Sequence, residues 1–253
     1  MKKEIREQLI QMAEPEYQRF AVGLIPGEDK MLGIRIPQLR ALAKQIVKSD
    51  WKAAIKEQDV YFEETMLHGM ILSYASKDMD EMLPYIKEFI PRVNNWSVCD
   101  SVFMGMHIFQ TDRKKTWKFI EAYLHSDKEF EIRVALIIMM QHLLKCDRQG
   151  KKTARLRVVG IDDLRVETRE KGLYVDKVFE ELDMVKTADY YASMAASWLL
   201  AEAFCCYPYN TYQYILENHL DDITHNKGIQ KITESKIPTN EVKSILKSSK
   251  RRN

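Results

Sequence analysis

The sequence predicts an all-α protein built as an α-solenoid of HEAT-like helical repeats. Nearly every segment carries apolar residues at three- and four-residue steps, which is the pattern of a helix with one buried face. From about residue 60 onward these segments form pairs at a spacing of roughly 30 to 40 residues, joined by short loops. A solenoid of this kind curves, so one helix of each pair is expected to line a concave face. An irregular helical bundle is the alternative.

Composition favours a single soluble domain over residues 1–253. The chain is 45% hydrophobic and 30% charged, which allows a sizeable core, and its net charge of +2 is too small to indicate a nucleic-acid partner by itself. No apolar run is long enough to cross a membrane, and the N-terminal segment lacks the apolar core of a signal peptide. The four cysteines lie in apolar segments without a CxxC pair, which predicts reduced, buried thiols in a cytoplasmic protein. They are Cys99, Cys146, Cys205 and Cys206.

The N-terminal half reads as a series of amphipathic helices. Pro37 suits the first turn of the third helix, because proline lacks an N–H that this position would leave unpaired. Asn94 and Asn95 are good starters for the seventh, since their side chains can accept from free backbone N–H groups. The expected helices span residues 2–13, 17–24, 37–48, 51–58, 61–76, 78–90 and 96–110.

The C-terminal half continues this pattern with one exception. Ser126 has capping-box spacing to Glu129 at the start of its helix. Residues 153–168 instead carry apolar side chains in short runs, which favours a small β-hairpin with its turn near Asp162 and Asp163. The remaining helices are expected at 112–124, 126–144, 174–186, 188–207, 208–218, 221–235 and 239–248.

Trp96 and Asp100 are the first candidate site residues. The apolar positions of their helix share one face, and Trp96 falls at its rim with Asp100 about 40° further around the axis. An indole beside a carboxylate, off the buried stripe, suits a cationic ligand. The competing interpretation is a rim tryptophan beside a solvated aspartate.

Arg133 and Trp198 are further candidates. Arg133 lies in the first turns of a helix that is apolar all round, so its guanidinium needs an anion, either a carboxylate such as Glu129 or a phosphate. Trp198 lies among small residues, and such a tryptophan is more often part of the core than of a site.

Other kinds of chemistry find little support. None of the six histidines forms an HxxxH or HExxH pair, so the sequence predicts no metal site. It also lacks a Walker loop, a GxGxxG motif and a GxSxG elbow.

Five short stretches of the chain form a recognisable set of motifs. They are Leu32-Gly33-Ile34-Arg35-Ile36-Pro37 with Leu39-Arg40, Asn95-Trp96-Ser97-Val98-Cys99-Asp100, Ile132-Arg133-Val134-Ala135, Tyr190-Tyr191 with Met194-Ala195-Ala196-Ser197-Trp198, and Asp221-Asp222-Ile223-Thr224-His225-Asn226-Lys227. Together, and in this order, they resemble the motifs of the AlkD family of HEAT-like-repeat DNA alkylation repair glycosylases, and they cover most of the chain.

The resemblance implies a monomeric DNA glycosylase that removes N3- and N7-alkylated purines from duplex DNA without metal or cofactor. Asp100, Trp96 and Trp198 fall on the family's functional positions, and Arg133 falls on its phosphate-contacting arginine. The residue chemistry agrees, because an alkylated purine is cationic and leaves as a neutral base. Its departure creates an oxocarbenium ion that a carboxylate can stabilise, while indole faces attract cations.

Two features depart from the family pattern. Arg35 stands where a glutamine can occur, and it is expected to lie near the DNA. Residues 147–172 are an insertion whose basic side chains either form a solvated surface or bind DNA. Those named as candidate DNA contacts are Lys151, Lys152, Arg155 and Arg157.

Two other functions remain open on the sequence. A non-catalytic HEAT-like relative would bind unusual DNA structures, although losing the aspartate or the tryptophans would favour that interpretation and all are present. A protein-binding helical scaffold would lack a continuous basic surface and salt-dependent affinity for DNA.

Overall fold

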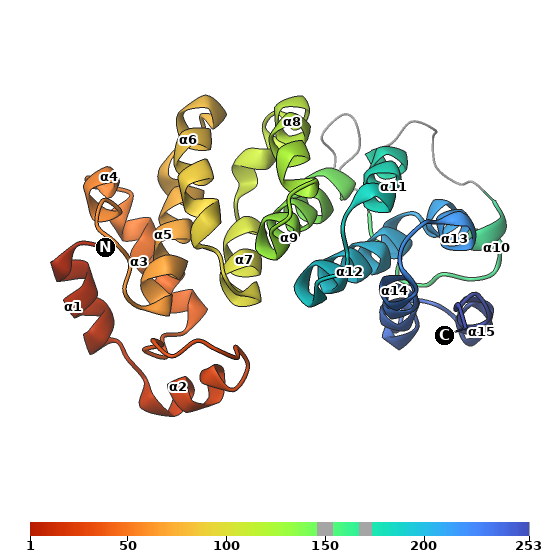
Figure 1. Ribbon diagram of the computed structural model, residues 1–253, viewed down its shortest axis with the longest axis horizontal. Helices are drawn as coiled ribbons and strands as arrows, with labels where there is room; N and C mark the ends of the chain where they lie inside the picture. Colours follow the sequence, from red (N-terminus) through yellow and green to blue (C-terminus); the bar gives the residue numbers. More distant parts are fainter. Residues whose placement is uncertain (146–153, 167–173, 253) are drawn as a thin grey trace. The chain divides into compact units, whose positions relative to one another are not determined.

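The computed structural model describes residues 1–145, 154–166 and 174–252, and the regular structure there is helical apart from one isolated bridge (Figure 1). The predicted fold class, an α-solenoid of helical repeats, is confirmed. The chain divides into two compact units, unit 1 (Met1–Asp112) and unit 2 (Arg113–Asn253), which we describe separately. The single domain predicted over residues 1–253 stays a prediction. No helix in the described ranges combines the length and apolarity needed to span a membrane.

Unit 1 is organised around α5, which is buried on nearly all sides. Its apolar residues, such as Met66 and Met70, are fully buried, and the helix packs against α3, α6 and α7. Gly69 allows the contact with α7, because a Cβ there would lie 2.6 Å from Val102. The helices of this unit are α1 (Lys3–Gln11), α2 (Pro15–Val22), α3 (Ile36–Ile46), α4 (Trp51–Ala54), α5 (Phe62–Ala75), α6 (Met79–Phe89) and α7 (Trp96–Phe103), with 3₁₀ turns at Ile90–Arg92 and His107–Gln110.

Glu63, buried at the start of α5, fixes the loop that joins α2 to α3. Its two carboxylate oxygens accept hydrogen bonds from the backbone N–H groups of Leu32, Gly33 and Ile34, at 2.8, 2.6 and 3.2 Å. Gly33 has a φ of +82° and lies so close to α2 that a Cβ would be 2.6 Å from the backbone nitrogen of Gln18. A buried carboxylate and a glycine therefore hold α2 in place.

The seventh helix ends earlier than the sequence predicts. The sequence predicts a helix that continues to Gln110, whereas α7 ends at Phe103 and a separate 3₁₀ turn follows. Arg40 explains the difference, because its Nη2 donates to the carbonyl of Ser101 at 2.8 Å. In a continuous α-helix the Ser101 carbonyl would accept from the N–H of Gly105. That N–H instead donates to the carbonyl of Val102 at 3.1 Å.

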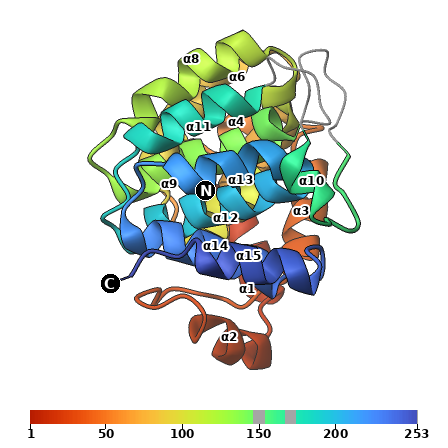
Figure 2. The same cartoon turned by 90° about the vertical axis from the view of Figure 1, so that its right-hand side faces the viewer.

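Unit 2 is organised around α12, which packs against α9, α13 and α14 (Figure 1). Its small residues, including Ala192, Ala196 and Ala203, are buried, and a Cβ at Gly228 of α14 would lie 2.5 Å from Leu200. Figure 2 shows α14 and α15 side by side. The helices are α8 (Arg113–Leu124), α9 (Glu129–Ile138) with a π-helical continuation (Met139–Leu144), α10 (Asp162–Arg165), α11 (Tyr174–Met184), α12 (Tyr190–Cys206), α13 (Pro208–Glu217), α14 (Asp222–Glu234) and α15 (Asn240–Ser248).

The hairpin predicted in the insertion is wrong for its described part. Asp162 and Asp163 open the short helix α10 rather than a turn between strands. Val159 pairs with another part of the chain, forming an isolated parallel bridge with Pro238. The N–H of Val159 donates to the carbonyl of Ile237 at 2.9 Å, and the carbonyl of Val159 accepts from the N–H of Thr239 at 3.0 Å. The apolar side chain thus serves a long-range contact that local alternation could not reveal.

Replacing Glu63 tests the loop anchor. Glu63→Ala is expected to lower the free energy of unfolding by roughly 3 kcal/mol, because three N–H groups lose their acceptor. Glu63→Gln should cost less, since its amide keeps one acceptor oxygen. Urea unfolding measures both, with the exposed Glu16→Ala on α2 as the matched control. A cost for Glu63→Ala no larger than the control's would contradict the anchor.

The stability of unit 2 is expected to depend on the protonation of His225. Its Nε2 lies 3.0 Å from the carbonyl of Ser249 and its Nδ1 lies 3.1 Å from Nδ2 of Asn218, so both nitrogens of a neutral ring are paired. Burial lowers the pKa of His225, and Arg251 adds to this effect, which the Ser249 bond opposes.

Because the folded state binds the proton less readily than the unfolded state, His225 contributes stability above the ordinary pKa of about 6.5. That contribution is lost as the pH falls below this value. Unfolding free energies at pH 7.5 and 5.5 should therefore differ more for the wild type than for His225→Gln. Equal differences for the two proteins would contradict the prediction.

Candidate functional site

Asn95 sets the start of α7 and thereby the direction of Trp96. The side chain of Asn95 accepts from the N–H of Val98 at 2.9 Å, as the predicted helix start requires. Val98, Cys99 and Val102 are fully buried, whereas Trp96 and Asp100 are partly exposed. Both candidate residues therefore lie off the buried face of the helix, as predicted.

The indole of Trp96 is held by a long-range hydrogen bond. Its Nε1 donates to the carbonyl of Leu24, just beyond the end of α2, at 3.2 Å. The two residues are 72 positions apart, so no local pattern predicts this contact. Because Glu63 fixes the loop that follows α2, the orientation of Trp96 depends on that loop.

Asp100 lies one helical turn after Trp96, about 6 Å further along the axis. Its backbone carbonyl accepts from the N–H of Met104 at 3.1 Å. Arg40 braces the next residue by donating to the carbonyl of Ser101, and its Nη1 also donates to the hydroxyl of Tyr74, at 3.1 Å. The end of α7 that carries Asp100 is thus tied to α3 and α5.

Arg35 is exposed and held in a defined direction. Its Nε donates to Oε2 of Glu14 at 3.0 Å, and its guanidinium carbon lies 4.6 Å from the centre of the Tyr17 ring. Arg35 directly follows the loop that Glu63 anchors, so this loop sets the position of Arg35. Its predicted proximity to DNA stays a prediction.

Arg133 is buried on α9, with 5% of its surface exposed. Its Nη1 donates to the carbonyl of Tyr191 at 2.8 Å, and the N–H of Tyr191 donates to the carboxylate of Glu129. Arg133 and Glu129 therefore both hold the first turn of α12 against α9. The predicted phosphate contact stays a prediction beside this structural role.

Trp198 lies on α12 at the edge of a pocket of about 240 Å³. The carboxylate of Glu202, one turn further on, is nearly buried and pairs with Lys145 at 3.0 Å and Arg155 at 3.4 Å. Unit 2 thus repeats the four-residue spacing of Trp96 and Asp100. The carboxylate of Glu202 ties α12 to Lys145 and Arg155.

Arg155 joins the insertion to α12. Besides its pairing with Glu202, its Nη2 lies 3.4 Å from the sulfur of Cys205, and the N–H of Leu156 donates to the Cys205 carbonyl at 2.9 Å. Burial raises the pKa of the Cys205 thiol, and Arg155 offsets this only in part. The thiol therefore stays protonated at neutral pH and is a poor nucleophile.

The other basic candidates of the insertion are less defined. Arg157 is exposed, as a DNA contact requires. Lys151 and Lys152 lie outside the described residues, as does Cys146, while Cys99, Cys205 and Cys206 are buried as predicted. Within the described ranges, no group of three or more His, Cys, Asp or Glu side chains is placed to hold a metal ion.

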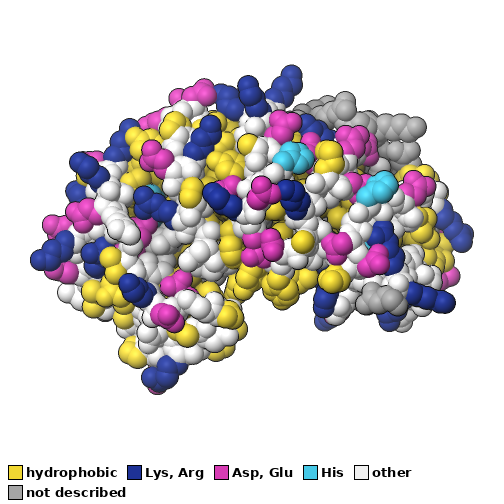
Figure 3. Space-filling view, in the orientation of Figure 1, with side chains coloured by type: hydrophobic (Ala, Val, Ile, Leu, Met, Phe, Trp, Pro, Cys, Tyr) yellow, Lys and Arg dark blue, Asp and Glu magenta, His cyan; other side chains and the backbone are white. Residues whose placement is uncertain are grey.

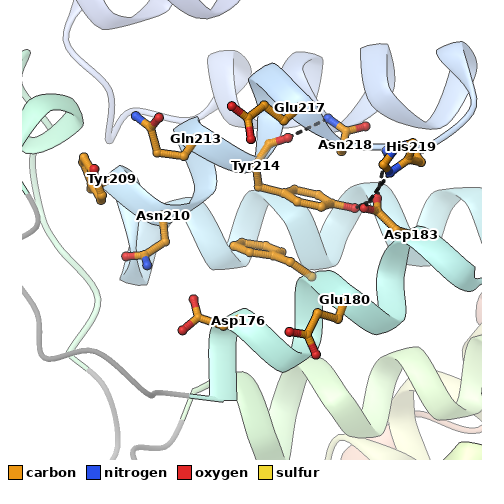
Figure 4. Close-up of a pocket in the computed structure, with 11 residues that line it drawn as sticks. Asp176, Glu180, Asp183, Tyr209, Asn210, Gln213, Tyr214, Glu217, Asn218 and His219 are labelled. Carbon is orange, nitrogen blue, oxygen red and sulfur yellow. Dashed lines mark hydrogen bonds and ion pairs between the residues drawn. The ribbon is translucent and has the colours of Figure 1, made fainter.

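A larger pocket, of about 430 Å³, lies between α11 and α13 (Figure 4). Its walls carry Asp176, Glu180 and Glu217, and the hydroxyl of Tyr214 donates to Asp183 at 2.6 Å. Burial and then the bond to Asp183 raise the pKa of the Tyr214 hydroxyl far above its usual range. This acidic lining would repel DNA phosphates, so we assign the pocket no part in DNA binding.

The structure brings Trp96, Asp100 and Arg35 into unit 1, and Arg133, Trp198 and Arg155 into unit 2. Sequence reasoning missed the residues that position them. Glu63 reads as an ordinary first-turn acid of its helix, and the Leu24 carbonyl carries no side-chain signal. Arg40 belongs to one of the family motifs, but the sequence gives no sign of its hydrogen bond to the Ser101 carbonyl.

Comparison with known families gives one finding that covers most of these residues. A family model described as DNA alkylation repair enzyme matches residues 5–163. The match includes Arg35, Trp96, Asp100 and Arg133, and it ends before Trp198. A search of curated proteins found no match.

Arg133→Ala separates the structural role of this residue from a DNA-binding role. Loss of the guanidinium removes a charged hydrogen bond that joins α9 to α12, so the free energy of unfolding should fall by about 1–3 kcal/mol. The exposed Arg19→Ala is the matched control for stability. If Arg133 also contacts a phosphate, affinity for duplex DNA per folded molecule should fall as well. Reduced stability with unchanged affinity would contradict the phosphate contact.

Proposed function

The chain belongs to the family of DNA alkylation repair enzymes, and on this basis we propose that it is a DNA glycosylase. The proposed reaction is hydrolysis of the N-glycosidic bond of N3- or N7-alkylated purines in duplex DNA. The match over residues 5–163 supports membership of the family, and the arrangement of Trp96 and Asp100 supports the proposed reaction. One observation carries the proposal: a partly exposed indole with a fixed orientation stands one turn from a partly exposed carboxylate.

The charge of the substrate explains why such a pair suffices. Alkylation at N7 or N3 makes the purine cationic, so it leaves as a neutral base and needs no strong acid to protonate it. Positive charge passes to the sugar as the bond breaks. A carboxylate held near that sugar stabilises the oxocarbenium ion and orients the water that attacks C1′.

We assign these two functions to Asp100 and assign Trp96 to the cationic base. An indole face attracts a cation with about 0.5–2 kcal/mol. The bond from Trp96 to Leu24 uses the indole N–H and leaves the ring faces available for stacking. Trp198 is proposed as a second aromatic contact.

Basic residues are proposed to bind the DNA backbone. Arg35, Arg155 and Arg157 are exposed, and Arg155 lines the same pocket as Trp198. Lys151 and Lys152 complete the set predicted from sequence. Figure 3 displays basic and acidic side chains interspersed over the visible surface, so particular arginines and lysines, rather than net charge, are expected to set affinity. The reduced cysteines support a cytoplasmic location.

Asp100→Asn is expected to lower the rate of base excision about 10²- to 10³-fold while leaving DNA binding nearly unchanged. Asparagine keeps the shape and one acceptor but removes the negative charge that faces the sugar in the transition state. Single-turnover release of N7-methylguanine, with enzyme in excess, measures the rate. Fluorescence anisotropy measures affinity for the same duplex.

The matched control is Asp80→Asn, which makes the same change at an exposed position of α6. This variant should excise at the wild-type rate. If Asp100→Asn does so too, Asp100 is a surface aspartate and the proposed mechanism is wrong.

A further inference from the structure

The pocket between α11 and α13 lies entirely within unit 2 and contains none of the residues proposed for base excision or DNA binding (Figure 4). Its volume of about 430 Å³ falls in the range of small-molecule sites, which is about 300–1,000 Å³. Two neighbouring helices supply nearly all of its lining, and this lining combines aromatic rings with carboxylates. The size and the lining together are suited to a small organic cation.

The aromatic part of the lining is held in place. The rings of Phe179 and Tyr214 stack with their centres 4.3 Å apart and their planes 5° from parallel. The hydroxyl of Tyr214 and the backbone N–H of His219 donate to the same oxygen of Asp183, at 2.6 and 2.9 Å, and Nδ1 of His219 lies 3.2 Å from the other oxygen. Figure 4 shows Tyr209 at the end of the pocket away from Asp183. Aromatic faces attract cations and also pack against methylene groups.

Three further carboxylates of the pocket are available to a ligand. The side chains of Asp176, Glu180 and Glu217 are exposed, and none of them forms an ion pair or a hydrogen bond within the described part of the chain. The nearby guanidinium of Arg251 donates to the backbone carbonyl of Asn218, at 2.6 Å, rather than to these carboxylates. A recess lined by charges of one sign raises the local concentration of ions of the opposite sign.

The carboxylates of α11 form a row with a defined spacing. Asp176, Glu180 and Asp183 lie within about 60° of one another around the helix axis and are separated by about 6 Å and then 4.5 Å along it. In an extended aliphatic chain with bonds of about 1.5 Å, ammonium groups joined by four or three methylenes are about 6 or 5 Å apart. Glu217 adds a carboxylate from α13. The row therefore has the spacing of an unbranched polyamine.

We propose that this pocket binds a linear aliphatic polyamine, in which two to four ammonium groups are joined by three or four methylenes. The ammonium groups pair with the row on α11 and with Glu217, and the methylene groups cover the rings of Tyr209 and Tyr214. A ligand in this position contacts both α11 and α13 and thus stabilises their packing. The proposal does not depend on the proposed glycosylase reaction.

Isothermal titration calorimetry of the full chain with spermidine tests the proposal. We expect one site per molecule and an affinity at least about tenfold higher than that of butylamine, because each of the two additional ammonium groups contributes up to about fivefold. Magnesium chloride is the second control, since it supplies a multivalent cation without methylene groups and should bind more weakly than spermidine. Spermidine should also raise the melting temperature, because it binds the folded state.

The double variant Asp176→Asn/Glu180→Gln removes two charges of the row and keeps the shape of both side chains. Its affinity for spermidine should fall about tenfold. The matched control is Asp189→Asn/Glu241→Gln, which makes the same change in net charge at exposed positions of unit 2 outside the pocket. This control should bind spermidine with wild-type affinity. Circular dichroism confirms that both variants are folded.

Equal affinities of the wild type for spermidine, butylamine and magnesium would overturn the assignment, as would wild-type affinity in the double variant of the row. Tighter binding of a trilysine peptide than of spermidine would overturn it too, because the pocket would then be a site for a basic protein segment. None of these measurements involves DNA. A failure of base excision therefore leaves their outcome unaffected.

Discussion

The hydrogen bonds between Glu63 and the backbone of residues 32–34 are the constraint on which the arrangement of unit 1 depends. They hold a loop whose glycine permits α2 to approach closely, and Gln18 of α2 returns a hydrogen bond to Met31 at 2.6 Å. The end of α2 then presents the Leu24 carbonyl to the indole of Trp96. The orientation of an aromatic side chain on α7 is thus set by a carboxylate on α5.

This dependence explains how a short helix can carry a precise pair of side chains. Only eight residues form α7, so the helix by itself fixes little. Asn95 caps its start, and Arg40 donates a hydrogen bond to the Ser101 carbonyl near its end. The carbonyl of Leu24 accepts from the indole of Trp96. Asp100 lies between these attachments. Such bracing from neighbouring elements is what a group acting by electrostatic preorganisation requires.

The sequence was sufficient for the fold class and for most helices, because apolar residues at helical spacing are a local signal. The same signal placed Trp96 and Asp100 off the buried face correctly. It failed where a distant partner decides the structure. Arg40 ends α7 from another helix, and Val159 pairs with Pro238, 79 residues later. The contact between the Leu24 carbonyl and the Trp96 indole is likewise a product of packing between helices.

The central claim is that the chain acts on alkylated DNA by releasing the base. Mass spectrometry of the products from a duplex with one N7-methylguanine tests this claim most directly. We expect free N7-methylguanine and an intact strand that carries an abasic site, both absent without the protein. Restored guanine in an intact strand, or an unchanged duplex, would contradict the glycosylase account.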